Sequence, residues 1–177
     1  MKYKLLLVLL AFSSTLFAQT NKADSTGHYS GKGFHVEFPT KWKLDTSGLM
    51  GSTCFIYAPA DDANDKFREN VNVVIQDLSG SGIDLEQYKD ITEKQLPSIF
   101  PDSKLEESTV IQTAGKEPYY RVSYSFTRNG SSIFIITICY IQNEKAYLVT
   151  FSTETARKEQ YIKTGETILK SFRLSSE

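Results

Sequence analysis

The stretch Ile133-Phe134-Ile135-Ile136-Thr137-Ile138-Cys139-Tyr140-Ile141 decides the fold, because it is apolar at odd and even positions alike. Side chains of a β-strand alternate between the two faces of a sheet, so a strand with one wet face alternates apolar and polar residues. A strand that is apolar on both faces is covered on both. The stretch therefore predicts a central strand with neighbours on both edges and helices on both faces.

Strand patterns flank this stretch on both sides. Before it, residues 120–127 alternate in polarity, and Asn129-Gly130 is the strongest short hairpin signal because both residues accept positive φ. After it, a polar turn at residues 142–145 leads into an apolar strand at residues 146–151. Earlier strand patterns lie at residues 34–38, 53–57, 71–75 and 110–111.

A helix is expected between the early and the late strands. Asp84 and Gln87 form a capping-box pattern at its start, and apolar residues recur at helical spacing from Leu85 to Ile99. Pro97 lacks the backbone donor that the next helical turn requires. The helix is therefore expected to kink or end near Gln95.

A second helix closes the chain, with one face formed by Tyr161, Gly165, Ile168, Leu169 and Phe172. Glycine costs such a helix about 1 kcal/mol relative to alanine, and close approach of the helix to the sheet would compensate. Trp42 follows a strand-ending proline and is expected to be buried. Together the patterns predict an α+β fold, an α/β/α sandwich in which an antiparallel sheet of six or seven strands carries helices on both faces.

Packing motifs are spread over residues 33–173: Phe34-x-Val36-x-Phe38-Pro39-x-x-Trp42, the stretch from Val71 to Tyr88, Gly115-Lys116-Glu117-Pro118-Tyr119-Tyr120-Arg121, Lys145-Ala146-Tyr147 and Ile168-Leu169-Lys170-Ser171-Phe172. They resemble those of PsbP-like and DcrB-like proteins, families that share an α/β/α sandwich with the Mog-type Ran-binding proteins. The functions of these families are diverse or unassigned, and include accessory subunits of photosynthetic water oxidation, envelope proteins and a nuclear transport factor. The resemblance therefore implies a fold and no catalytic residue.

The N-terminus has the pattern of a secretory signal peptide over residues 1–18. Two lysines precede an apolar run at residues 5–12, and polar residues lead to a cleavage site expected after Ala18. The run is too short to span a bilayer. The first cysteine is Cys54, far from that site, so no lipid anchor is expected. The mature protein is expected to be exported, either to the periplasm or fully secreted.

Residues 19–32 are expected to form a flexible polar leader, and residues 33–174 a single domain. Residues 1–18 contain two of the 20 basic residues and none of the 21 acidic ones, so the remainder has a formal net charge of −3. Binding to a phosphate backbone rests on clustered Lys and Arg, so no nucleic-acid partner is expected. The expected partner is an envelope protein or a small ligand.

Few residues are candidates for catalysis. His28 lies in the expected leader and His35 on the polar side of the first strand, so the two histidines are interpreted as isolated and short of the three or four ligands that zinc needs. Ser81 in Gly80-Ser81-Gly82 fits neither a nucleophile elbow nor a dinucleotide loop, and is interpreted as a turn residue. The sequence therefore predicts no catalytic, cofactor-binding or metal-binding residue and no cofactor.

The loop over residues 59–67 is acidic. Asp61, Asp62 and Asp65 are predicted to form a partner-binding loop. Their oxygens suit calcium, but the glycine at position six and the glutamate at position twelve of a calcium hand are missing, so a solvated connection is favoured over a metal site.

The two cysteines, Cys54 and Cys139, both lie in expected strands. Export would place them where a disulfide persists. Free cysteine is also among the most commonly buried residue types. Sequence spacing leaves the bridge and the two free thiols as alternatives.

Two classes of function remain. The favoured class is a non-catalytic binding or accessory module of the cell envelope. The alternative is an envelope hydrolase or other enzyme whose site is assembled only in three dimensions. A deep pocket with convergent polar groups and shifted pKa values would favour the enzyme.

Overall fold

The structure is a computed structural model that describes residues 26–63, 65 and 67–175. The strands in this part of the chain are β1 (Thr26–Gly31), β2 (Phe34–Pro39), β3 (Lys43–Asp45), β4 (Cys54–Tyr57), β5 (Asn70–Asp77), β6 (Lys104–Ile111), β7 (Tyr119–Arg128), β8 (Ser131–Gln142), β9 (Lys145–Glu154) and β10 (Arg173–Leu174). The α-helices are α1 (Leu85–Ile99) and α2 (Lys158–Ser171), and short 3-10 turns lie at Leu49–Gly51 and Thr155–Arg157.

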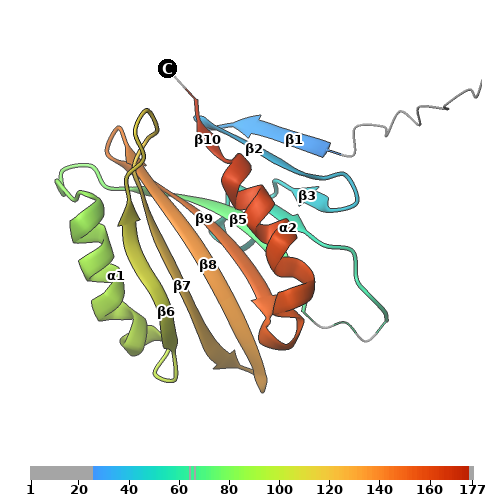
Figure 1. The fold of residues 1–177 in the computed structure, drawn as a ribbon. Helices are drawn as coiled ribbons and strands as arrows, with labels where there is room; N and C mark the ends of the chain where they lie inside the picture. The colour runs from blue at the N-terminus through green and yellow to red at the C-terminus, as the bar shows by residue number, and fades with distance from the viewer. Residues whose placement is uncertain (1–25, 64, 66, 176–177) are drawn as a thin grey trace, which may run out of the picture.

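A seven-stranded antiparallel sheet forms the centre of the fold, in the order β3-β4-β5-β9-β8-β7-β6 (Figure 1). β8 is the strand with two apolar faces, and it pairs with β9 on one edge and β7 on the other, as its pattern predicts. Ile136 of β8, for example, lies between Phe151 of β9 and Ser123 of β7. A second antiparallel sheet has the order β1-β2-β10.

Helices cover both faces of the large sheet, as predicted. Ile168 of α2 and Ile138 of β8 belong to one core, which also includes the inner face of β2. Tyr88 of α1 packs on a second core that contains Cys139, the next residue along β8. Because successive strand residues point to opposite faces, the two cores lie on opposite sides of the sheet.

Three packing predictions are confirmed. Ile135 and Ile136, which point to opposite faces, are 7% and 1% exposed. Trp42 is 3% exposed. A Cβ atom on Gly165 would lie only 2.5 Å from Cδ2 of Phe151, so this glycine allows α2 to approach the sheet closely.

The capping box of α1 is confirmed, but its predicted end is wrong. Asp84 accepts a hydrogen bond from the backbone N–H of Gln87 at 2.8 Å, and the Gln87 side chain accepts the N–H of Asp84 at 3.0 Å. The helix then passes the expected boundary at Gln95 and contains Pro97. Because Pro97 lies in the last turn, its missing N–H removes a single helical hydrogen bond, and the helix continues to Ile99.

β1 corrects the predicted flexible leader. Thr26–Gly31 pairs with β2 along its whole length, through a turn at Lys32-Gly33 in which both residues have positive φ. Most side chains of β1 are small or polar, which explains why its pattern resembled a leader. The predicted signal peptide and residues 19–25 lie outside the described residues. Among those described, no helix combines the length and apolar composition of a membrane span.

Candidate functional site

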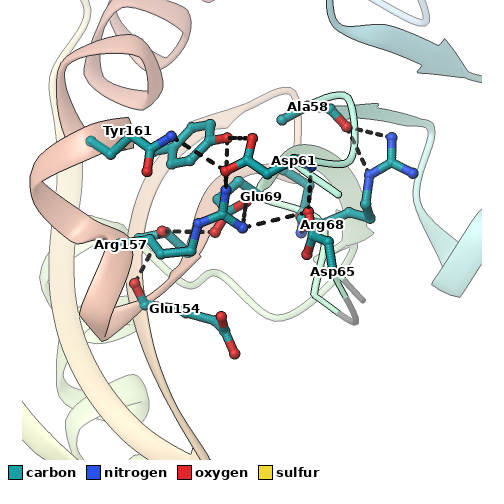
Figure 2. A network of polar contacts seen from close by, with 11 residues as sticks. Ala58, Asp61, Asp65, Arg68, Glu69, Glu154, Arg157 and Tyr161 are labelled. Carbon is teal, nitrogen blue, oxygen red and sulfur yellow. Dashed lines mark hydrogen bonds and ion pairs between the residues drawn. The ribbon is translucent and has the colours of Figure 1, made fainter. Parts of the chain in front are cut away.

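The acidic loop between β4 and β5 folds onto the start of α2 (Figure 2). Asp61 forms an ion pair with Arg157 and accepts a hydrogen bond from the Tyr161 hydroxyl at 2.9 Å. Asp65 lies 3.5 Å from Nη1 of Arg157 and accepts the backbone N–H of Asp61 at 3.0 Å. Asp62 is exposed, and its carbonyl accepts the N–H of Asp65 at 3.4 Å. The carboxylates of Asp61 and Asp65, two members of the predicted partner-binding loop, are therefore engaged within the chain.

A buried carboxylate, Glu69, completes this network. Its side chain is fully buried, and its Oε2 lies 3.1 Å from Nη1 of Arg157. Burial raises the pKa of Glu69, and the charge of Arg157 opposes that rise only in part. Burial lowers the pKa of Arg157, but Glu69, Tyr161, Asp61 and Asp65 raise it by more, so the guanidinium stays charged. Because the guanidinium occupies the space between the carboxylates, the network anchors the loop to α2.

Sequence reasoning missed the partners of this loop, because Asp61 and Arg157 are 96 positions apart and no local pattern connects them. Glu69 was the available signal. A charged residue directly before an apolar strand, here the start of β5, is expected to have a partner when it is buried.

A cleft of about 510 Å³ opens between the C-terminal half of α2 and the loop that joins β6 to β7. α2 packs on β9, β2 and β5, so the beginning of β7 on this face lies beyond the helix (Figure 1). Tyr119 and Arg121 of β7 line the space that results. Small-molecule sites have volumes of about 300–1,000 Å³, so the cleft is large enough for a small ligand.

One wall of the cleft is aromatic, and the lining has an excess of positive charge. The ring centroids of Tyr119 and Tyr140 are 5.3 Å apart, and Tyr140 stacks on Phe172 at 5.5 Å. The charged lining residues are Lys116, Arg121, Lys170 and Arg173, together with Glu117 and Glu166. Four basic side chains against two acidic ones suit a ligand with an anionic group and an apolar body.

Arg121 and Tyr140 keep their protons at neutral pH. Arg121 donates to Glu107 at 2.9 Å and to Glu166 at 2.6 Å. Burial lowers the pKa of Arg121, but these two carboxylates raise it by more. Burial raises the pKa of Tyr140. Both side chains are therefore proton-bearing groups at neutral pH, suited to hydrogen bonding and charge recognition rather than to proton abstraction.

The two histidines lie together, which corrects their predicted isolation. In the pairing of β1 with β2, His28 is opposite Glu37 and Ser30 is opposite His35. One ligand atom from each of His28, His35 and Glu37 lies within 4.8 Å of the others. Sequence reasoning missed this cluster because it placed His28 in the leader. The available signal was Lys32-Gly33, a two-residue hairpin turn.

Ser81 and the cysteines have structural surroundings. The hydroxyl of Ser81 donates to the carbonyl of Leu78 at 2.6 Å in the turn after β5. Cys54 and Cys139 are free and buried, on opposite faces of the sheet. β5 and β9 lie between the two strands that carry these cysteines, so those strands are about 14 Å apart. A disulfide requires only ~4.4–6.8 Å between the two Cα atoms. Burial raises the pKa of each thiol to about 12, so both stay protonated.

This architecture, a seven-stranded antiparallel sheet between two helices, is that of PsbP-like proteins. Residues 25–174 match the PsbP family, and the chain belongs to that family. Among curated proteins, none matches the sequence.

Solved structures from several bacteria have the same fold. Cyanobacterial PsbP (CyanoP) from Synechocystis sp. PCC 6803 is 17% identical with a TM-score of 0.65, over 85% of this chain and 92% of that one. LpqN, involved in cell envelope biogenesis of Mycobacterium tuberculosis, is 12% identical with a TM-score of 0.62, over 85% and 92%. A Pseudomonas aeruginosa protein of unknown function is 13% identical with a TM-score of 0.60, over 86% and 99%. At these identities the likeness shows the fold alone, and the resemblance to DcrB-like and Mog-type proteins stays a prediction.

Proposed function

We propose that this protein is an exported, non-catalytic binding or accessory module of the cell envelope, and that the cleft beside α2 holds an anionic ligand with an apolar body. The observation that carries the proposal is the cleft itself, where an aromatic wall and an excess of basic side chains converge. An apolar pocket with a few convergent polar groups is the default location for ligand binding in a domain of unassigned activity.

Export rests on the N-terminal pattern. The two lysines and the apolar run of residues 1–18 are typical of a signal peptide, and cleavage near Ala18 would release a chain without a lipid anchor into the periplasm or the medium. The fold shared with LpqN, a protein of cell envelope biogenesis, supports an envelope location. We propose neither a cofactor nor a nucleic-acid partner for this module.

The protonation states of two side chains in the cleft favour ligand binding over the alternative, an envelope hydrolase. Arg121 and Tyr140 both have pKa values raised away from neutrality, so neither is a base there at neutral pH. General acid–base catalysis is most effective with a group whose pKa lies near the operating pH. These two side chains are better suited to hold an anion than to activate a nucleophile.

The acidic loop, residues 59–67, is a second proposed contact, for a protein partner. Asp61 and Asp65 pair with Arg157, so replacing Asp61, Asp62 and Asp65 together with Asn should destabilise the chain and would not test the contact alone. Asp62→Asn leaves both pairs in place. We expect it to weaken capture of an envelope partner, and unchanged capture would remove the loop from the proposal.

The cleft is tested with the fluorescent probe 8-anilinonaphthalene-1-sulfonate, which combines an anionic group with aromatic rings. We expect saturable binding of one probe per chain to residues 19–177. An exposed ion pair contributes about 0.5–1 kcal/mol, so Lys116→Ala and Arg173→Ala should each weaken binding about two- to fivefold. Lys94→Ala, an exposed lysine of α1 outside the cleft, is the matched control. Equal affinity in all variants would contradict the proposal.

A further inference from the structure

The outer face of the β1–β2 hairpin carries two imidazoles and a carboxylate at metal-ligand spacing. We propose that His28, His35 and Glu37 bind one Zn²⁺ ion there, at a site separate from the cleft. Imidazole nitrogens and a carboxylate oxygen are ligands that Zn²⁺ prefers, and three protein ligands leave a fourth position for water or an exchangeable ligand.

The strand register places the three side chains on one face. His28 of β1 is directly opposite Glu37 of β2, and His35 lies two positions before Glu37 on the same strand. Residues two apart on a strand, and residues opposite each other across a pair, share a face. The inner face of β2 is fixed in the core, where Phe34 and Val36 are fully buried. The ligands therefore project from a rigid element, as a metal site requires.

The distances are close to those of a zinc site. Oε1 of Glu37 lies 3.9 Å from Nδ1 of His28 and 3.7 Å from Nε2 of His35. Bonds of about 2.0–2.1 Å in a tetrahedral arrangement place ligand atoms about 3.3 Å apart. All three side chains are exposed or half-buried, so the shift of less than ~1.5 Å that closure needs is within the reach of ordinary rotamer adjustment.

A second observation concerns the orientation of His35. The Ser30 hydroxyl lies 2.7 Å from Nδ1 of His35, on the side of the ring away from Glu37. When Nδ1 carries the proton and donates it to Ser30, Nε2 keeps its lone pair for a metal. Zinc-binding histidines typically donate their other ring nitrogen to an oxygen acceptor in this way, which fixes the tautomer and the ring. Ser30 is thus a positioning residue for His35.

The cation on the adjacent strand, β10, is engaged by backbone carbonyls. Arg173 of β10 is opposite His35, but its Nη1 donates to the carbonyls of Lys170 and Phe172 at 2.5 and 2.6 Å. Its guanidinium is therefore held at the end of α2, where those carbonyls lie. In the cluster of His28, His35 and Glu37, the carboxylate lies between the two imidazoles, an arrangement that attracts a divalent cation.

The test is titration of ZnCl2 into untagged, metal-free residues 19–177 by calorimetry, with long-range ¹H–¹⁵N spectra of the imidazoles. His28 and His35 are the only histidines of the chain, so the spectra contain two side chains. We expect one Zn²⁺ per chain, with shifts of the metal-bound nitrogens, Nδ1 of His28 and Nε2 of His35.

The variants locate the site. His35→Ala and Glu37→Gln should each weaken Zn²⁺ binding at least tenfold, and Ser30→Ala about tenfold, the lower end of the effect of removing an outer-shell partner. Asp90→Asn, an exposed carboxylate of α1, is the control and should bind as the parent does. Lys116→Ala should also bind Zn²⁺ unchanged, which separates this site from the cleft. Unshifted imidazole nitrogens, or parental affinity in both His35→Ala and Glu37→Gln, would overturn the proposal.

Discussion

Replacing Arg157 with methionine tests the network that fixes the acidic loop. The change keeps much of the apolar stem but leaves Glu69, which is fully buried, without its cation at 3.1 Å. The side chain of Asp65, 5% exposed, loses the same partner. Breaking a buried ion pair from one side costs about 3–5 kcal/mol. Because the Arg157 side chain is 17% exposed, we expect about 3 kcal/mol at pH 7.

The pH dependence of this loss has a defined sign. Burial already raises the pKa of Glu69 above its ordinary 4.5, and removal of Arg157 takes away an opposing charge, so the pKa rises further. When a carboxyl group has a higher pKa in the folded chain than in the unfolded chain, the folded chain becomes less stable as the pH rises. The loss occurs between the pKa of the unfolded chain and the pKa of the folded chain. Arg157→Met should therefore lose less stability at pH 5 than at pH 7.

Urea denaturation at both pH values measures the effect, with the fluorescence of Trp42 as the probe. Trp42 is the only tryptophan, and its ring centroid is 6.4 Å from that of Tyr161 in the network. The double variant Glu69→Gln/Arg157→Met should recover at least half of the loss at pH 7. A loss below about 1 kcal/mol at pH 7, or an equal loss at both pH values without recovery, would refute the reasoning.

Other substitutions test the packing of the sandwich, each by urea denaturation. Gly165→Ala places a methyl group against the fully buried Phe151, so we expect a net loss of about 1–2 kcal/mol despite the better helix propensity of alanine, and a gain would contradict the close approach. Ile135→Asn and Ile136→Asn should each cost about 3 kcal/mol or more, because both faces of β8 are covered, whereas tolerance of one would mean a wet face. Trp42→Ala should cost about 3–5 kcal/mol, and a loss below ~1 kcal/mol would place the ring in solvent.

Patterns that depend on neighbours in the sequence predicted the central part of the fold. The apolar run of β8 predicted a strand covered on both faces, and the capping box at Asp84 predicted the start of α1, because each signal is contained within a few residues. Pro97 was misread because its effect depends on its distance from the helix end. β1 was missed because its small and polar residues obtain their strand structure from pairing with β2.

The candidate sites could not be predicted in the same way. The cleft joins the β6–β7 loop to α2, about fifty residues later in the chain, and exists because α2 covers only part of the sheet. The contact of Asp61 with Arg157 likewise depends on how α2 lies against the β4–β5 loop. The histidine cluster depends on the pairing of β1 with β2, whose one local signal was the hairpin turn at Lys32-Gly33. The cleft and the Asp61–Arg157 contact are produced by packing between elements that are distant in the sequence.

The central claim, that the cleft beside α2 binds an anionic ligand, is tested most directly by mapping the binding site in solution. Backbone amide ¹H–¹⁵N spectra of residues 19–177 are recorded during titration with 8-anilinonaphthalene-1-sulfonate. The account predicts that the largest shifts fall on residues 113–121 of the β6–β7 loop and β7 and on residues 166–174 at the end of α2. Shifts confined to the α1 face or to the β3–β4 edge of the sheet would contradict it.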